Sequence, residues 1–113
     1  MSTHYSKESL SEVAGGDEDF MEIVAKTFLE EIPPDLTALV EAVKNDNKEL
    51  AYQFAHKMKP NLEMFGIPVQ KNITSIEAWT KTSKNSSTVT EHVDHLNEVL
   101  HLVFEELKAD YPS

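Results

Sequence analysis

The sequence predicts an all-α protein, an antiparallel up-down four-helix bundle closed by a short N-terminal capping helix. Apolar residues recur at helical spacing along nearly the whole chain. The chain holds only three glycines, and it lacks the Asn-Gly and Asp-Gly pairs that form tight β-hairpins. Four long helical segments joined by short connections are typical of the up-down bundle.

The length and composition restrict the class of protein. A chain of 113 residues is long enough for a single domain over residues 1–113, with an ordered core expected over about 8–109. The absence of cysteine excludes disulfides and thiolate metal sites. A net charge of −10 at pH 7 argues against nucleic acid or an anionic membrane as a partner. No apolar stretch approaches the about 18 residues of a membrane helix. A chain without cysteine needs no oxidising compartment, so we expect a cytoplasmic protein. We also expect it to be a monomer.

The first half of the chain predicts two helical segments. A short helix over 6–14, with Leu10 and Val13 inward, ends at the Gly15-Gly16 pair. A long segment then starts at Asp17, whose acidic first turn suits a helix N-terminus. Two prolines interrupt its backbone hydrogen bonds, which predicts either one bent helix or two helices meeting at a kink. Its expected inward side chains are Phe20, Ile23, Val24, Thr27, Phe28 and Ile32 before the prolines, and Leu36, Leu39, Val40 and Val43 after them.

The second half predicts three more helices. One follows the turn at 45–47, with Asp46 and Glu49 as a capping pair, and ends at Gly66. A shorter one starts near Pro68, with Val69, Ile73, Ile76 and Trp79 on its inward side. After a polar loop over 81–87, the last helix opens at Thr88 with Glu91 as its capping-box partner. Its narrow apolar seam consists of Val89, Val93, Leu96, Leu100, Val103 and Leu107.

His56 is the side chain that stands apart on the helix over 46–66. The predicted core face of this helix holds Leu50, Phe54, Met58, Leu62 and Phe65. At about 100° per residue, His56 lies roughly 160° from Phe54 and Met58 and therefore points to solvent. Lys59 follows at i+3, a true neighbour on a helix, and Lys57 lies on the flank. The ring nitrogen of an exposed imidazole can attack an acyl phosphate, and an adjacent ammonium can bind the phosphoryl charge.

Helix geometry alone leaves other interpretations open. The same pattern fits an ordinary surface histidine on a helical adaptor that binds a partner helix without chemistry. A third hypothesis, a bundle metalloprotein, would draw on His92, His95 and His101 of the last helix. A di-iron bundle needs inward-facing Glu-x-x-His motifs on two helices, which this chain does not provide. These histidines flank the apolar seam, so boundary packing is favoured over metal binding.

The segment Ala55-His56-Lys57-Met58-Lys59-Pro60-Asn61-Leu62-Glu63-Met64-Phe65-Gly66 resembles the histidine phosphotransfer (HPt) domains of bacterial two-component phosphorelays. The family pattern there is roughly Ala-His-x-Leu-Lys-Gly-Ser, followed within a few residues by Gly. The upstream stretches 16–33 and 36–46 are also similar to the family's opening helices. The resemblance covers most of residues 8–80.

The resemblance implies a phosphocarrier rather than an enzyme. His56 would accept a phosphoryl group from a receiver-domain aspartate and pass it to another receiver, and Lys59 would stabilise that group. The partners would be response-regulator receiver domains, including those of hybrid histidine kinases. No cofactor of its own is expected, since the receiver supplies Mg²⁺. The expected docking residues around His56 are Tyr52, Gln53, Lys57, Pro60 and Met64.

Pro60 is the departure from the family pattern, which usually has Gly at this position. Proline keeps the place free of a long side chain, but it removes the backbone hydrogen bond to the carbonyl of His56. The sequence therefore puts the local helix geometry in question while leaving the nucleophile in place.

Overall fold

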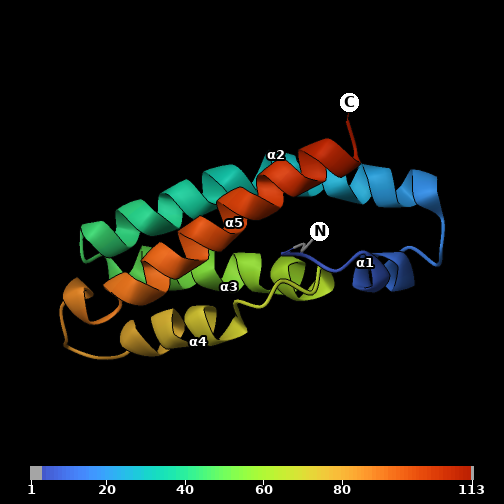
Figure 1. Cartoon of the computed structure of the whole chain (residues 1–113). Helices are drawn as coiled ribbons and strands as arrows, with labels where there is room; N and C mark the ends of the chain where they lie inside the picture. Colours follow the sequence, from blue (N-terminus) through green and yellow to red (C-terminus); the bar gives the residue numbers. More distant parts are fainter. Residues whose placement is uncertain (1–3, 113) are drawn as a thin grey trace.

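The computed structural model describes residues 4–112 and confirms the all-α prediction, with no strand in this range. Its elements in chain order are α1 (Lys7–Val13), α2 (Glu18–Lys44), α3 (Lys48–Met64), α4 (Gln70–Trp79), the 3₁₀ turn η1 (Ser86–Thr88) and α5 (Thr90–Asp110). Each of the four longer helices packs on the next along the chain, and α5 returns to α2 (Figure 1). The short α1 contacts α2 and α3 near one end of the bundle. No described helix is long and apolar enough to cross a membrane.

Helix α2 passes through Pro33 and Pro34 as one continuous helix of 27 residues, which decides between the two predicted arrangements. Its N-cap is Asp17, whose side chain accepts hydrogen bonds from the backbone N–H groups of Asp19 and Phe20. The prolines cannot donate backbone hydrogen bonds. Burial of the helix on both sides of them therefore supplies the stability that this turn loses.

The predicted inward face of the first half of α2 is confirmed at Phe28 and Ile32 and wrong at Phe20, Ile23 and Thr27. The side chains that reach the core are Met21, Ala25, Phe28 and Ile32, whereas Phe20 and Ile23 are 44% and 59% exposed. Thr27 is also exposed. Two adjacent stripes of α2 both have helical spacing, and only packing against α3 and α5 selects one. The predicted inward positions of Val13 and Leu50 are wrong as well, because both are exposed.

The apolar seam of α5 is confirmed, since all six predicted side chains are buried. Both predicted capping pairs are wrong. Asn47, not Asp46, caps α3 by accepting a hydrogen bond from the backbone N–H of Leu50, and Asp46 takes a left-handed turn conformation with φ of 58°. α5 begins at Thr90 rather than Thr88, because Asn85 instead caps the 3₁₀ turn over residues 86–88.

Gly66 ends α3 as predicted, and α1 closes over this end of the bundle. The φ of Gly66 is +63°, and a Cβ there would lie 2.8 Å from Cβ of Ser6. The backbone N–H of Ser6 donates to the carbonyl of Phe65 at 2.7 Å. The close backbone approach explains why the position needs glycine.

Tyr5 joins this end of the bundle to the last turn of α5. Its hydroxyl donates to Oδ2 of Asp110 at 2.5 Å, and the ring is buried. Burial, followed by the hydrogen bond to Asp110, raises the pKa of the Tyr5 phenol above its ordinary value of 10.0. The fold thus favours the neutral phenol. The contribution of the neutral Tyr5 phenol to the free energy of unfolding is therefore complete below pH 10. It is lost as the pH rises toward the raised pKa.

We expect Tyr5→Phe to lower the free energy of unfolding at pH 7 by about 0.5–1.5 kcal/mol, the net contribution of a typical hydrogen bond, because its partner Asp110 is exposed to water. We also expect a smaller loss of stability between pH 10 and 12 than in the unsubstituted protein, because the titrating phenol is gone. Urea unfolding at pH 7, 10 and 12 measures both effects. Parallel pH profiles for the two proteins would contradict the linkage to Tyr5.

Candidate functional site

His56 lies in the middle of α3 with 67% of its side chain exposed, which confirms the prediction that it points to solvent. The opposite side of this helix is fixed in the core by Ala51, Ala55, Met58 and Leu62, all almost fully buried. Two small alanines and two flexible apolar side chains let α3 pack closely between α2 and α4. The orientation of His56 is therefore determined by the burial of its own helix.

Glu77 of α4 is the site residue that the sequence did not reveal. Its Oε2 lies 3.4 Å from Nδ1 of His56, and its Oε1 lies 3.3 Å from Nζ of Lys59. Only 13% of the Glu77 side chain is exposed. One carboxylate thus bridges the imidazole and the lysine that follows it on α3. Glu77 is the one acid in α4, on the flank of its buried face, but no spacing rule connects it to His56.

This contact distinguishes the two nitrogens of the imidazole. A proton on Nδ1 can be donated to the Glu77 carboxylate, so the neutral tautomer with hydrogen on Nδ1 is favoured. Nε2 then carries the free electron pair on the exposed imidazole. The carboxylate also stabilises positive charge that develops on the ring when Nε2 forms a bond.

Lys57 points the other way, toward α2. Its ammonium lies 3.0 Å from Oδ1 of Asp35, a residue of α2 that is only 7% exposed. A buried carboxylate without a cation would be costly, so this pair helps to fix α3 against α2. Lys57 and Lys59 therefore tie α3 to its neighbours on both sides, and His56 lies between them.

Tyr52 covers one side of the imidazole. Its ring is stacked on His56 with the centroids 5.6 Å apart and an interplanar angle of 10°. Tyr52 and Gln53 also line an open hollow of about 580 Å³ formed with Lys48, Glu49, Thr80 and Lys81. Two of the predicted docking residues are therefore brought together at the start of α3.

Met64, a third predicted docking residue, lies two turns beyond His56 on the side of α3 that faces α2. It lines a groove of about 260 Å³ between the two helices. The exposed Phe20 and Ile23, which the core does not use, belong to the same groove. A groove lined by exposed apolar side chains is typical of a protein docking surface.

Pro60 is exposed within α3, which continues through it to Met64. Because proline has no N–H, the carbonyl of His56 loses its usual helical donor. The helix nevertheless continues without a break, and the surface one turn beyond His56 stays free of a long side chain.

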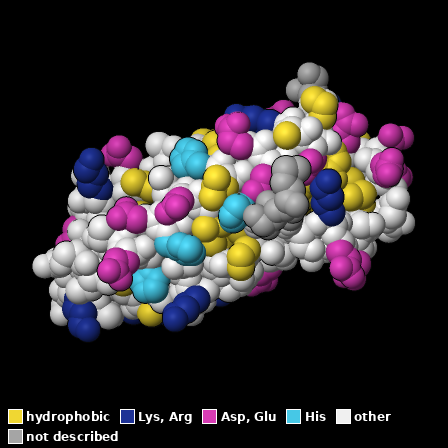
Figure 2. Space-filling model, viewed as in Figure 1, with side chains coloured by type: hydrophobic (Ala, Val, Ile, Leu, Met, Phe, Trp, Pro, Cys, Tyr) yellow, Lys and Arg dark blue, Asp and Glu magenta, His cyan; other side chains and the backbone are white. Residues whose placement is uncertain are grey.

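The histidines of α5 form no comparable site. Figure 2 shows histidine side chains spread over one face of the molecule and separated by acidic and apolar groups. Nδ1 of His92 lies 3.1 Å from Nδ2 of Asn72, and His101 packs edge-on against Phe104, which agrees with boundary packing. Within residues 4–112, no group of three or more His, Asp or Glu side chains could hold a metal ion.

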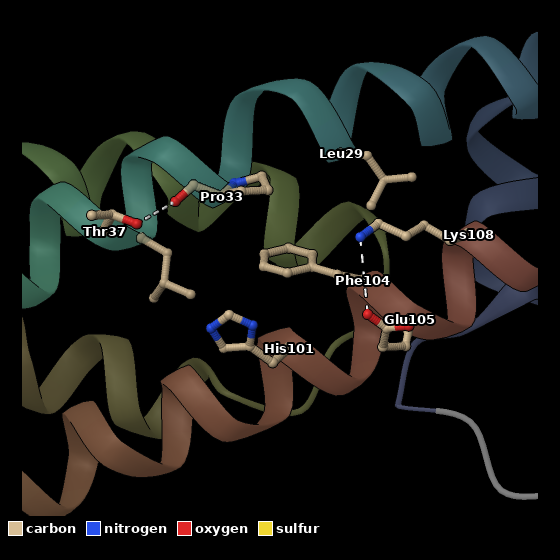
Figure 3. Close-up of a pocket in the computed structure, with 8 residues that line it drawn as sticks. Leu29, Pro33, Thr37, His101, Phe104, Glu105 and Lys108 are labelled. Atoms are coloured by element: carbon tan, nitrogen blue, oxygen red, sulfur yellow. Dashed lines mark hydrogen bonds and ion pairs between the residues drawn. The ribbon is translucent and has the colours of Figure 1, made fainter. Parts of the chain in front are cut away.

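A separate hollow of about 370 Å³ lies between α2 and α5 beside Pro33 (Figure 3). His101 and Phe104 point into it from α5, and Leu29 borders it from α2. Its one lysine, Lys108, faces Glu105 at 3.9 Å. The hollow does not include His56 or the residues around it.

No protein-family model, curated protein or solved structure matches this chain. The chemistry of the His56 site is therefore the main indication of the function. That site combines an exposed imidazole, a carboxylate on Nδ1, a lysine on the same carboxylate and one adjoining hollow that shares Tyr52.

Proposed function

We propose that this protein is a histidine phosphotransfer protein that carries a phosphoryl group on Nε2 of His56. The observation that carries the proposal is the bridge from Glu77 to both His56 and Lys59. A surface histidine without a function does not require a nearly buried carboxylate at one ring nitrogen, nor a lysine bound to the same carboxylate. The likeness of residues 55–66 to HPt domains supports the same function.

The transfer step follows from the tautomer. The electron pair of Nε2 attacks the phosphorus of an aspartyl phosphate on a receiver domain. The bond from phosphorus to the aspartate oxygen breaks, and the aspartate leaves as a carboxylate. The proton on Nδ1 stays with the ring and its hydrogen bond to Glu77, so the imidazole carries a phosphoryl group on Nε2. The reverse step delivers the group to a second receiver, and the carrier is restored.

Lys59 contributes two charge interactions to this mechanism. In the resting protein it lies against Oε1 of Glu77, which offsets a negative charge that would repel phosphate. Because its chain is flexible and partly exposed, its ammonium can also reach the incoming phosphoryl oxygens. We propose that the receiver provides Mg²⁺ and the activated aspartate, while this chain provides the nucleophile and its positioning.

The docking surface proposed for the receiver includes the groove between α2 and α3. Its exposed Phe20 and Ile23 line it together with Met64, which lies about two turns beyond His56 on α3. An apolar contact here would bury surface that the monomer leaves in water, which favours association. A receiver that docks on this groove would bring its aspartate toward α3.

We expect Pro60→Gly to leave the rate of phosphoryl transfer within about threefold of that of the unsubstituted protein, because neither residue places a long side chain next to His56. Pro60→Arg should slow transfer at least about 10-fold by placing a long side chain where the receiver approaches. The measurement is the rate of label transfer from a phosphorylated receiver. Equal rates for the two variants would mean that the partner does not approach this side of α3.

The proposed function is tested by mixing the protein with separately phosphorylated receiver domains of the source organism. We expect one or more receivers to transfer label within seconds to minutes, and the product to be stable in base and labile in acid, as a phosphoramidate is. A protein that binds receivers tightly but takes no phosphoryl group would instead be a helical adaptor.

A further inference from the structure

Positive charge is concentrated in one part of this acidic chain. Residues 48–84, which include α3, α4 and the start of the following loop, contain six lysines and three acids. The rest of the chain contains four lysines and seventeen acids. The helices that carry His56 and Glu77 are therefore locally basic on a protein whose net charge is −10.

Two of these lysines line the hollow at the start of α3 and the end of α4, and aromatic rings hold both in place. The ammonium of Lys48 lies 5.2 Å from the centroid of Trp79 and donates to the carbonyl of Thr82. The ammonium of Lys81 lies 5.8 Å from the centroid of Tyr52. Cation–π contacts of this kind restrict a lysine without neutralising its charge.

The lysines near His56 differ in whether they form an ion pair with a carboxylate. Lys57 and Lys59 are within 4 Å of Asp35 and Glu77 respectively, at 3.0 and 3.3 Å. Among the described residues, no carboxylate forms an ion pair with Lys48 or Lys81, although Glu49 also lines the hollow. The hollow therefore keeps positive charge available for a ligand.

The hollow adjoins the reactive histidine. Tyr52 is one helical turn before His56, and the same Tyr52 ring contacts both the His56 imidazole and the Lys81 ammonium. A ligand that fills the hollow would thus contact the same Tyr52 ring that stacks on the imidazole. A site in this position can orient a partner with respect to Nε2.

We infer that this hollow, which we call the basic hollow (Lys48, Tyr52, Gln53 and Lys81, with Glu49 and Thr80), docks an acidic segment of the protein that exchanges phosphoryl groups with His56. The inference rests on the proposed function. An acidic carrier repels an acidic partner at long range, and a local basic site beside the nucleophile reverses that repulsion where the two proteins must meet. The hollow then selects receivers that carry acids next to their phosphoaspartate.

The test compares Lys81→Glu and Lys81→Gln with a matched control, Lys108→Glu, which changes another exposed lysine, on α5. The measurement is the second-order rate constant for transfer from a phosphorylated receiver as the salt concentration increases. We expect about a 10-fold lower value at low salt for Lys81→Glu, a smaller loss for Lys81→Gln and a change below about twofold for Lys108→Glu. The difference between Lys81→Glu and the unsubstituted protein should diminish at high salt.

Labelling by phosphoramidate, a small donor that needs no docking, separates the two proposals. We expect equal labelling of His56 in all four proteins. Normal transfer from the receiver to Lys81→Glu would overturn the docking inference and leave the proposed function intact. Absence of labelling in the unsubstituted protein by both donors would overturn the proposed function itself.

Competition by inorganic phosphate shows whether the basic hollow binds a segment of a partner protein or a small anion. We expect 10 mM phosphate, at constant ionic strength, to leave transfer to the unsubstituted protein unchanged. Strong inhibition that is lost in Lys81→Glu would make the basic hollow a small-anion site and overturn its assignment to a partner protein.

Discussion

Replacing His56 with glutamine is expected to abolish phosphoryl acceptance and leave the fold unchanged. Glutamine is a good helix former of similar size, and its amide cannot form a stable phosphoramidate. The site is largely exposed, so the free energy of unfolding should change by no more than about 0.5 kcal/mol. Transfer from a phosphorylated receiver and thermal unfolding followed by circular dichroism give the two measurements.

His95→Gln is the matched control, because His95 is also exposed on a helix but lies among the acids of α5. We expect it to accept label at the normal rate. If His56→Gln still accepts label and His95→Gln does not, the acceptor is on α5 and the assignment of the site is wrong.

The second large effect is expected from Glu77→Gln. The variant keeps the shape of the side chain and loses the charge that favours a proton on Nδ1 and stabilises the ring as Nε2 reacts. A hydrogen bond to a charged group contributes about 1.5–3 kcal/mol, so we expect transfer to slow about 10- to 100-fold. Because the effect acts on the imidazole, labelling by phosphoramidate should slow by a similar factor.

Glu63→Gln provides the control for Glu77→Gln. Glu63 is an exposed acid two turns beyond His56 on the same helix. Its replacement removes a charge near the site without touching the imidazole, and we expect less than a threefold change. Equal effects of the two substitutions would show that Glu77 acts only through the net charge of the surface. A normal rate with Glu77→Gln would remove it from the mechanism.

The orientation of His56 could be predicted from the sequence because it depends on one helix alone. The angular distance from Phe54 and Met58 follows from the geometry of α3, and the burial of Met58 and Leu62 agrees with it. The seam of α5 was predictable for the same reason, since the six residues of the seam recur at helical spacing along one face and all are buried.

Features that depend on two helices could not be predicted in this way. The bridge from Glu77 to His56 and Lys59 joins positions about 20 residues apart, and only the packing of α4 on α3 brings them together. The inward face of α2 was misjudged because Phe20 and Ile23 have the same spacing as true core residues. The two capping pairs failed because α3 starts one residue later, with Asn47 as its N-cap, and because Asn85 caps a separate 3₁₀ turn ahead of α5.

The most direct test of the central claim is to locate the phosphoryl group itself. The protein should be mixed with a phosphorylated receiver, kept at alkaline pH, digested and analysed by tandem mass spectrometry. We predict that an added phosphoryl group will be found on His56, in the peptide that contains residues 55–59, and that brief acid treatment will remove it. A phosphoryl group on any other residue, or none after exposure to every receiver of the source organism, would contradict the account.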